Sequence, residues 1–324
     1  MSIRRLLVLP HLKVHNANAL SSPVTIGFPA MTAWLGFVHA LQRKLNSTGY
    51  PTLRLVAAAV ISHGCDLQTY RGPGDFEYSI VGTGNPLEPK TGKDKPEGYA
   101  ERPSFIEEPR CHLDVSLMIE YQTDSETQER VRNPDFMALL DHTLMRMKVA
   151  GGDLESFGSP ELQILDEAEG RDTARLMRRL MPGFALIERR ELMQQAMEQG
   201  QDALDAMLDY LAVHHTCEQD DEGNIRWVSQ RKLDSEGRKP GWIVPIATGF
   251  QGISALARAK NQRDPDTPHR FAESVVTLGE FRMAHRIQTL DEVLWRYHAD
   301  LANNLYLCQQ LQTDAQEIEN DGFY

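Results

Sequence analysis

Four short polar side chains stand close together near the amino terminus. Asn16, Asn18, Ser21 and Ser22 separate two apolar segments of the chain. Amide and hydroxyl groups donate and accept hydrogen bonds, so they can meet phosphate oxygens, sugar hydroxyls or base edges. Asn and Ser also cap their own backbone in turns. This segment therefore predicts either a nucleic-acid contact or a self-capped loop.

The formal charge is distributed unevenly along the chain. The 324 residues together carry −12, yet residues 1–65 contain no Asp or Glu and hold six basic side chains. A mildly basic amino-terminal region in an acidic protein predicts one local anionic partner. Because the net charge of the whole molecule would repel a polyanion, the composition argues against a general nucleic-acid coat.

Composition and spacing argue against several classes of protein. No window approaches 18 uncharged apolar residues, so no membrane helix is predicted, and the apolar run 6–9 is too short for a signal peptide. Four scattered cysteines predict reduced thiols in a cytoplasmic protein without metal or cofactor. The run His214-His215-Thr216-Cys217 is a weak metal signal, because it has no second half.

Apolar periodicity predicts an α+β core in residues 1–170. Strands are predicted at 6–14, 54–63, 111–121 and 162–165, and helices at 29–44 and 133–147. The resulting order, β-α-β-β-α-β, is that of the ferredoxin-like unit used by RNA-recognition modules and by many unrelated proteins. Residues 124–132 are predicted to form a polar turn.

Two glycine-rich segments interrupt this core. Residues 68–109 predict a protruding arm rather than a packed layer, the alternative being a disordered surface loop. The segment 149–160 contains Ala150-Gly151-Gly152 and offers backbone N–H groups to a phosphate, but it also suits a tight helix-to-strand connection. It matches neither the P-loop nor the GxGxxG pattern, so a nucleotide-hydrolysing site is not predicted.

Residues 171–324 are predicted to form an accessory region of helical and mixed structure. Helices are predicted at 171–180, 188–211 and 290–298, a strand at 183–187, a helix-like segment after Glu273, a polar loop at 219–239 and an acidic, loosely ordered tail. Arg178 and Arg179 close the first of these helices. They predict either a phosphate clamp or an ordinary solvated helix face.

Several stretches together resemble the Csy-two (Csy2) family, the Cas-five-type subunit of type I-F CRISPR surveillance complexes. They are Asn16-Ala-Asn-Ala-Leu-Ser-Ser-Pro-Val-Thr-Ile-Gly-Phe-Pro, Gly36-Phe-Val-His-Ala-Leu-Gln-Arg, Cys111-His-Leu-Asp-Val-Ser-Leu, Ala150-Gly-Gly, Arg178-Arg-Leu-Met-Pro-Gly-Phe-Ala-Leu, Gly241-Trp-Ile-Val-Pro-Ile, Thr267-Pro-His-Arg-Phe-Ala-Glu and Leu278-Gly-Glu-Phe. The combination is specific, although no single piece is, and it covers nearly the whole chain. The arm and the segment 219–239 depart from the family pattern.

The resemblance implies a ferredoxin-like core (residues 1–170) with a β-hairpin thumb at 66–110, and an accessory region at 171–324. It further implies a non-catalytic subunit that holds the 5′ handle of the CRISPR RNA. Such a subunit pairs with the large Csy-one subunit and contacts the Csy-three backbone subunit, and the assembled complex holds target DNA.

A single-stranded handle is bound through phosphate contacts, hydrogen bonds to splayed bases and stacking surfaces. The residues and the resemblance together predict RNA contacts from Asn16, Asn18, Ser21, Ser22, Arg43, Arg178, Arg179, Trp242, His269 and Arg270. For the aromatic side chains among these, core packing is the alternative role.

Two other functions stay open at this point. Some Cas-five relatives cleave their precursor RNA without a metal, and such chemistry needs a His or Lys close to a 2′-hydroxyl. His11, His15, His39 and Lys44 are the candidates for that role, although solvated or structural histidines are more common. The other open function is an assembly scaffold with no RNA contact of its own.

Overall fold

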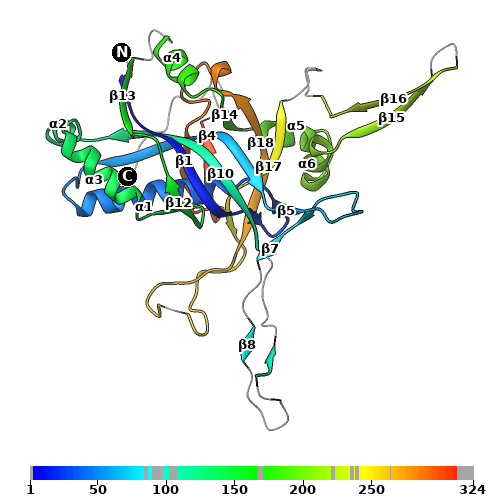
Figure 1. Cartoon of the computed structure of the whole chain (residues 1–324), viewed down its shortest axis with the longest axis horizontal. Coiled ribbons are helices and arrows are strands. Elements are labelled where there is room, and N and C mark those ends of the chain that lie inside the picture. The colour runs from blue at the N-terminus through cyan, green and yellow to red at the C-terminus, as the bar shows by residue number, and fades with distance from the viewer. Residues whose placement is uncertain are drawn as a thin grey trace.

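A large antiparallel sheet organises the molecule (Figure 1). The computed structural model describes residues 3–83, 87–89, 96, 98–101, 108–166, 171–219, 223–233, 237, 241–262 and 264–311. Within these residues the sheet is accompanied by six helices and several short hairpins, a mixed α/β arrangement. None of the described helices combines the length and the apolar character needed to cross a membrane.

The amino-terminal part of the sheet confirms the strands and helices predicted there. Its elements are β1 (Ile3–Asn18), α1 (Met31–Ser47), β4 (Arg54–Leu67), β10 (Glu108–Gln122), α3 (Pro134–Leu144), β12 (Gly152–Ser156) and β13 (Glu161–Asp166). β10 lies between β1 and β4, antiparallel to both. β12 and β13 pair with β1 on its other edge.

The carboxy-terminal part continues the same sheet. It contains β14 (Phe184–Glu188), β17 (Trp242–Gly252), β18 (Ala272–Met283), β19 (Trp295–Asp300) and β20 (Leu305–Gln310). Ile61 and Ser62 of β4 pair with β14, and Ala58 pairs with Trp295 of β19, so these strands form a ring that closes on β4. From His63 to Leu67, this edge of β4 pairs with no strand of the described chain.

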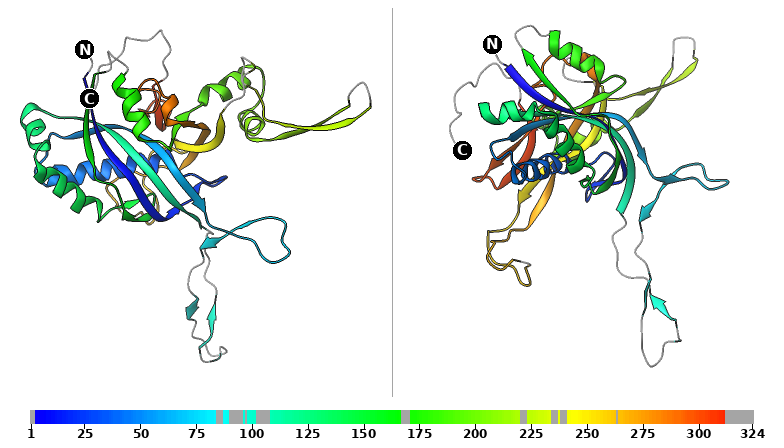
Figure 2. Two further views of the ribbon diagram at one scale, coloured as in Figure 1. Left: turned by 45° about the horizontal axis from the view of Figure 1, so that its top comes forward. Right: turned by 60° about the vertical axis from the view of Figure 1, so that its left-hand side comes forward.

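Shorter elements project from the sheet or cover it. They are β2 (Leu20–Ser22), β3 (Thr25–Ile26), β5 (Thr69–Tyr70), β6 (Ser79–Ile80), β7 (Gly82–Thr83), β8 (Glu88–Pro89), β9 (Ala100–Glu101), α2 (Ser125–Val131), β11 (Lys148–Val149), α4 (Arg171–Arg179), α5 (Arg190–Glu198), α6 (Ala203–Leu211), β15 (His214–Gln219), β16 (Ile225–Gln230) and the 3₁₀ turn η2 (Ala284–Arg286). Figure 2 shows the β5–β6 and β15–β16 hairpins standing away from the body.

Two hydrophobic cores lie on opposite faces of the sheet, because strand side chains alternate. Leu7 and Leu9 of β1 pack with α1 and α3 on one face. Leu6 and Val8 point to the other face and pack with α4 and the segment around η2. The second core covers only part of its face, so the remainder of that face is available to solvent and ligands.

One predicted turn and one predicted helix are wrong at the level of single elements. Residues 124–132 are not a turn but contain α2. The Asp124 carboxylate caps this helix by accepting a hydrogen bond of 2.8 Å from the Thr127 N–H. The predicted helix 188–211 is two helices, α5 and α6, separated by Gly200 at φ +98° and a new cap at Asp202. A cap depends on one side chain, which periodicity over a long window does not detect.

Other predictions were overturned by non-local pairing. The segment after Glu273 is β18, and 290–298 is a turn followed by the start of β19. Residues 219–239 contain β16 of a hairpin rather than only loop, and the polar segment after Asn16 belongs to the end of β1 and the β2–β3 hairpin. Strand ladders between distant segments override local preference. The predicted acidic tail lies outside the described residues.

Candidate nucleic-acid interface

A groove of about 580 Å³ lies between α1 and the turn that joins β11 to β12, and we call it the α1 groove. Asn18 and Ser21 line it from β1 and β2, Gly36 and Ala40 from α1, and Gly151 from the turn. Because Gly36 and Ala40 stand one helical turn apart and carry no long side chain, this face of α1 leaves the groove open. The groove joins the two segments from which the sequence predicted phosphate or base contacts.

Charged side chains in the wall of the α1 groove are largely paired. Arg110 lines the groove beside Glu108 and forms an ion pair with it. Lys148 also lines the groove and pairs with Asp153. Both pairs are partly or fully exposed, so an incoming phosphate could compete for either cation. Sequence analysis did not single out Arg110 or Lys148.

Two further cations extend the groove along α1. Arg43 and Lys44 are exposed, and their spacing from Gly36 and Ala40 places them on the same stripe of the helix. No ion pair is seen for either side chain within the part of the chain that the structure describes. The groove therefore continues into a short positively charged surface.

The polar side chains at the groove are engaged in local hydrogen bonds. The Asn18 carboxamide accepts from the Leu20 N–H at 3.0 Å and donates to the Leu20 carbonyl at 3.2 Å. The hydroxyls of Ser21 and Ser22 lie 2.9 and 2.6 Å from the Thr25 hydroxyl. Three of the four predicted contacts thus stabilise the β2–β3 hairpin in the free chain. Ser22 is nearly buried, whereas Ser21 remains partly accessible.

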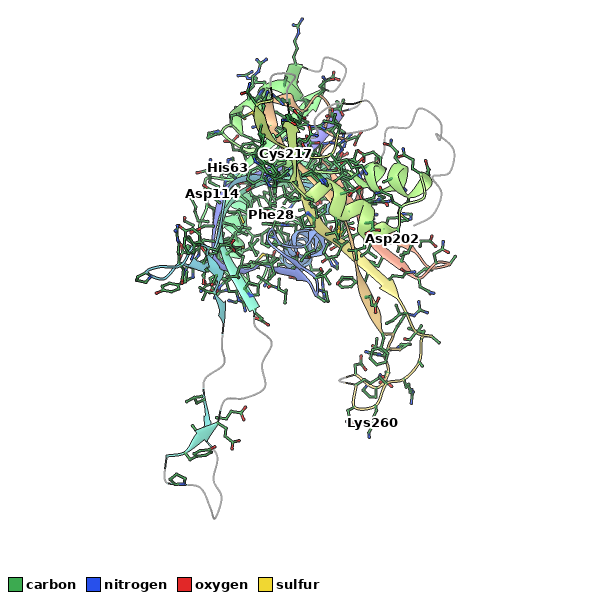
Figure 3. The ribbon with its side chains drawn as sticks, turned by 90° about the vertical axis from the view of Figure 1, so that its right-hand side faces the viewer. Phe28, His63, Asp114, Asp202, Cys217 and Lys260 are labelled. Atoms are coloured by element: carbon green, nitrogen blue, oxygen red, sulfur yellow. The ribbon has the colours of Figure 1, made fainter. Side chains whose placement is uncertain are left out.

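The half of the sheet that α4 leaves uncovered carries polar side chains, and we call it the open sheet face. Its members alternate along three strands with residues of the first core. They are His11, Lys13 and His15 of β1, His63 of β4, and His112 and Asp114 of β10, while Ser116 of β10 points to the same side but is fully buried. Figure 3 labels His63 and Asp114 on this face, with Phe28 nearby.

The imidazole rings of the open sheet face form two stacked pairs. His11 and His63 have ring centroids 4.2 Å apart, and His15 and His112 have centroids 4.5 Å apart. The His112 ring also accepts from the Asn16 backbone N–H at 3.4 Å. Asn16, at φ +56°, is thereby tied to this face rather than to the α1 groove.

His63 is held in one neutral form by its partners. Its Nδ1 lies 2.7 Å from the Pro182 carbonyl oxygen, and its Nε2 lies 2.7 Å from the Ser116 hydroxyl. A carbonyl can only accept, so Nδ1 carries the proton and Nε2 accepts from Ser116. Burial lowers the pKa of His63, and the nearby His11 adds to this effect. His63 is also the extra residue of a bulge, since Ser62 pairs with Val115 and Gly64 with Asp114.

Asp114 offsets the cations beside it. Its carboxylate oxygens accept hydrogen bonds from His11 and Lys13. Burial alone would raise the pKa of Asp114, but these two partners lower it below its ordinary value. The open sheet face is therefore polar and nearly neutral, not a strongly basic patch.

Trp242 lies in a second cavity, of about 340 Å³, on the other side of the β2–β3 hairpin from the α1 groove. Its indole ring makes edge or tilted contacts with Phe184 and Phe281, and Phe281 in turn meets Phe28 edge-on. We call this the aromatic cavity. Trp242 is 58% exposed, so the predicted stacking role is sterically open to it.

Arg178 and Arg179 lie on a different part of the molecule. They end α4, which packs on the second core, whereas α1 packs on the first. Arg179 pairs with Glu161, which pairs in turn with Val8 of β1. About 30 Å of extended strand separates Val8 from Asn18. The structure does not bring the two arginines to the α1 groove.

His269 and Arg270 belong to the connection between β17 and β18. His269 forms an isolated bridge with Ala257, and Arg270 donates to the Asn304 side chain. The Arg270 side chain packs directly against Gly252, because a Cβ atom there would collide with it. Arg270 fastens this connection to the β19–β20 turn. Its Nε finds no partner among the described residues.

The candidates for ribonuclease chemistry do not converge on one site. His11 and His15 lie on the open sheet face, while His39 and Lys44 are exposed on α1, which covers the opposite face. His214, His215 and Cys217 are exposed on β15. Within the described residues, no group of three or more His, Cys, Asp or Glu side chains is placed to hold a metal ion.

Two comparisons place the chain among known proteins. The family described as CRISPR-associated protein (Cas_Csy2) matches residues 7–308. A protein of Pseudomonas aeruginosa (strain UCBPP-PA14), described as CRISPR-associated protein Csy2, is 32% identical over 323 residues, which cover 93% of this chain and 94% of that protein. The match spans the α1 groove, the open sheet face and the aromatic cavity.

Proposed function

The chain belongs to the Csy2 family of CRISPR-associated proteins, and from this we propose that it is a non-catalytic subunit of a type I-F CRISPR surveillance complex. In that complex it binds the 5′ handle of the CRISPR RNA in the cytoplasm. It pairs with the large Csy-one subunit and touches the Csy-three backbone subunit, while the assembled complex holds target DNA.

The sheet order supports a ferredoxin-like core for this function. The order β12/β13, β1, β10, β4, all antiparallel with α1 and α3 on one face, matches what a β-α-β-β-α-β unit forms. We further propose that the arm between β4 and β10 serves as the thumb that displaces one nucleotide of the guide. The described parts of this arm contain the β5–β6 and β8–β9 hairpins.

The observation that carries the proposal is the α1 groove. It brings together Ser21 and the backbone of Gly151, and the exposed cations Arg43 and Lys44 continue this surface along α1. Ser21, Arg43 and Lys44 all belong to the amino-terminal segment that has no acidic residue before Asp66. Neutral donors with a few cations suit a short, structured single strand better than a long polyanion. Trp242 offers a stacking surface on the far side of the same hairpin.

An assembly scaffold without RNA contact is the second candidate, favoured by one specific observation. Asn18, Ser21 and Ser22 already hydrogen-bond within their own hairpin. If those bonds persist in the complex, the hairpin orders a protein interface and leaves RNA to other subunits.

Photocrosslinking separates these two functions. The full chain, co-expressed with its large-subunit partner, is assembled on guide RNA that carries photoreactive bases in the 5′ handle. We expect crosslinks between Asn16 and Arg43, around Gly151 and at Trp242. Crosslinks that fall only on the partner, with the assembly intact, would contradict handle binding and leave the scaffold function.

A further inference from the structure

We propose that the aromatic cavity accepts a single unstacked nucleobase of the bound RNA strand. This inference rests on the proposed function and adds to it a site for one particular base. The cavity is lined by residues of β4, β14, β17 and β18 together with Phe28, so five segments distant in sequence build it.

The state of Trp242 is the first observation. Trp34 and Trp295 are fully buried, and their indole N–H groups donate to the carbonyls of Pro29 and Leu186. The Trp242 indole N–H makes no hydrogen bond to the described residues, and the residue is more than half exposed. Phe184 meets the ring edge-on and Phe281 meets it at a tilt of 57°, so neither ring stacks flat on it and a face stays free for stacking on a planar partner.

The β4 residues that line the cavity offer polar groups that a base edge can reach. Ser62, Gly64 and Cys65 of β4 line the cavity. This edge of β4 has no strand partner beyond Ser62 in the described chain, so alternate N–H and C=O groups point into the cavity region. The Ser62 hydroxyl, on a nearly buried residue, also makes no hydrogen bond within the described chain. A base edge can use all of these groups.

The size of the cavity favours a base over a peptide. About 340 Å³ lies at the small end of the roughly 300–1,000 Å³ typical of small-molecule pockets. The unpaired edge of β4 is short, because the strand ends at Leu67. The bulge at His63, seen in the pairing of β4 with β10, also makes the strand irregular there. An added peptide strand needs a longer regular edge to gain main-chain hydrogen bonds. A planar ring stacked on Trp242 needs only the cavity itself.

The bulge connects the aromatic cavity to the open sheet face. His63 lines the cavity and stacks on His11, so one imidazole belongs to both surfaces. A nucleotide with its base in the cavity would place its sugar and phosphate near His11 and Lys13. Both side chains are exposed, and although each hydrogen-bonds Asp114, the Lys13 ammonium has further N–H groups to donate.

The test is a double-mutant cycle between protein and RNA. Handle RNA oligonucleotides, each with one abasic residue at a different position, are titrated against the full chain and against its assembly with the large subunit. The proteins are wild type, Trp242→Ala, Trp242→Phe and the control Trp227→Ala, whose indole is similarly exposed on the distant β15–β16 hairpin.

We expect one abasic position to weaken wild-type binding about tenfold, within the range for loss of one base–aromatic stack. Trp242→Ala should weaken binding of the intact RNA by a similar factor and lose sensitivity to that position, whereas Trp242→Phe and Trp227→Ala should keep it. Handle binding with no position coupled to Trp242 would overturn the base site alone. The base site would also be overturned if Trp242→Ala weakened only the association with the large subunit in the absence of RNA. Absence of handle binding by wild type in both forms would overturn the proposed function itself.

Discussion

The backbone N–H of Asn18 donates a hydrogen bond of 2.9 Å to the carbonyl oxygen of Ala150. This bond joins the last residue of β1 to the turn between β11 and β12 and fixes one wall of the α1 groove. Ala150 and Gly151 both have positive φ, at +48° and +79°, as a tight two-residue turn requires. The shape of the groove therefore depends on how closely this turn packs against β1.

The first prediction concerns that packing. A Cβ atom at Gly152 would lie 2.6 Å from the His15 carbonyl oxygen and 2.7 Å from the Ala17 nitrogen. Gly152→Ala must push the turn away from β1, and we expect a loss of about 1–3 kcal/mol in the free energy of unfolding. Gly36→Ala is the control, because a Cβ there meets nothing within 4 Å and Ala favours a helix. Urea unfolding measures both, and equal stabilities would contradict the inferred contact.

The second prediction concerns the α1 groove as a binding surface. Gly36→Glu places a carboxylate in the groove, and we expect handle RNA affinity to fall about fivefold, the effect of about 1 kcal/mol from one like charge in water. His39→Glu adds a carboxylate to α1 on a stripe outside the groove, where it faces a different cavity. It should change affinity much less. If the two variants lose affinity equally, the groove is not where the RNA binds.

The third prediction concerns Arg43 and the salt dependence of binding. Arg43→Ala should weaken handle binding at low salt and lower the slope of log affinity against log salt by about 0.7, the loss of one phosphate contact to a single strand. Arg54→Ala is the control. Arg54 is also an exposed arginine, but it is the first residue of β4 and does not line the α1 groove. An unchanged slope for Arg43→Ala would remove this residue from the interface.

The fourth prediction concerns the connection between the two parts of the sheet. Glu120 of β10 accepts from Arg4 of β1 and from Arg296 of β19, and both arginines also reach Asp291. Glu120→Gln removes one negative charge that offsets the two partly buried guanidinium groups of Arg4 and Arg296. Because these groups keep some contact with water, we expect a loss of about 2 kcal/mol, below the 3–5 kcal/mol of a fully buried pair.

Thermal or urea unfolding measures this loss. Glu155→Gln, at an exposed position of β12, provides the matched removal of one carboxylate and should change stability very little. A Glu120→Gln variant as stable as Glu155→Gln would show that the network contributes no net stability.

The fifth prediction concerns the protonation of His63. Burial lowers its folded pKa below the unfolded value of about 6.5. The unfolded chain therefore takes up the proton first, and His63 makes stability fall as the pH drops from about 6.5 toward the folded pKa. Ser116→Ala removes the hydroxyl that donates to Nε2. It should raise the His63 pKa and reduce this pH dependence, apart from any constant loss of stability.

Nuclear magnetic resonance of the imidazole nitrogens tests the assignment directly. Wild-type His63 should titrate below an ordinary histidine and carry its proton on Nδ1 at neutral pH. Ser229→Ala removes the comparable serine partner of His215 on the distant hairpin and should leave His63 unchanged. A proton on Nε2 in the wild type would refute the inferred hydrogen-bond direction.

Local pattern was sufficient for much of the amino-terminal half. Alternation predicts β10, and the apolar stripe of Trp34, Leu41 and their neighbours predicts α1, because burial of one face imposes these periods on the sequence. The same alternation makes His11, Lys13 and His15 share a face, and it makes His112 and Asp114 share one. This signal could have identified the open sheet face, but a single strand does not reveal which strand lies beside it.

The sequence by itself determined the residue types available for binding, the acid-free amino-terminal segment and the family to which the chain belongs. The tertiary structure alone decided which of those residues meet. It placed Asn18 and Ser21 opposite Gly151, sent Arg178 and Arg179 to the other face of the sheet, and built the aromatic cavity from five separate segments. The physical reason is that strand pairing is non-local. The ring closes where Trp295 meets Ala58, and nothing in either local sequence specifies the other.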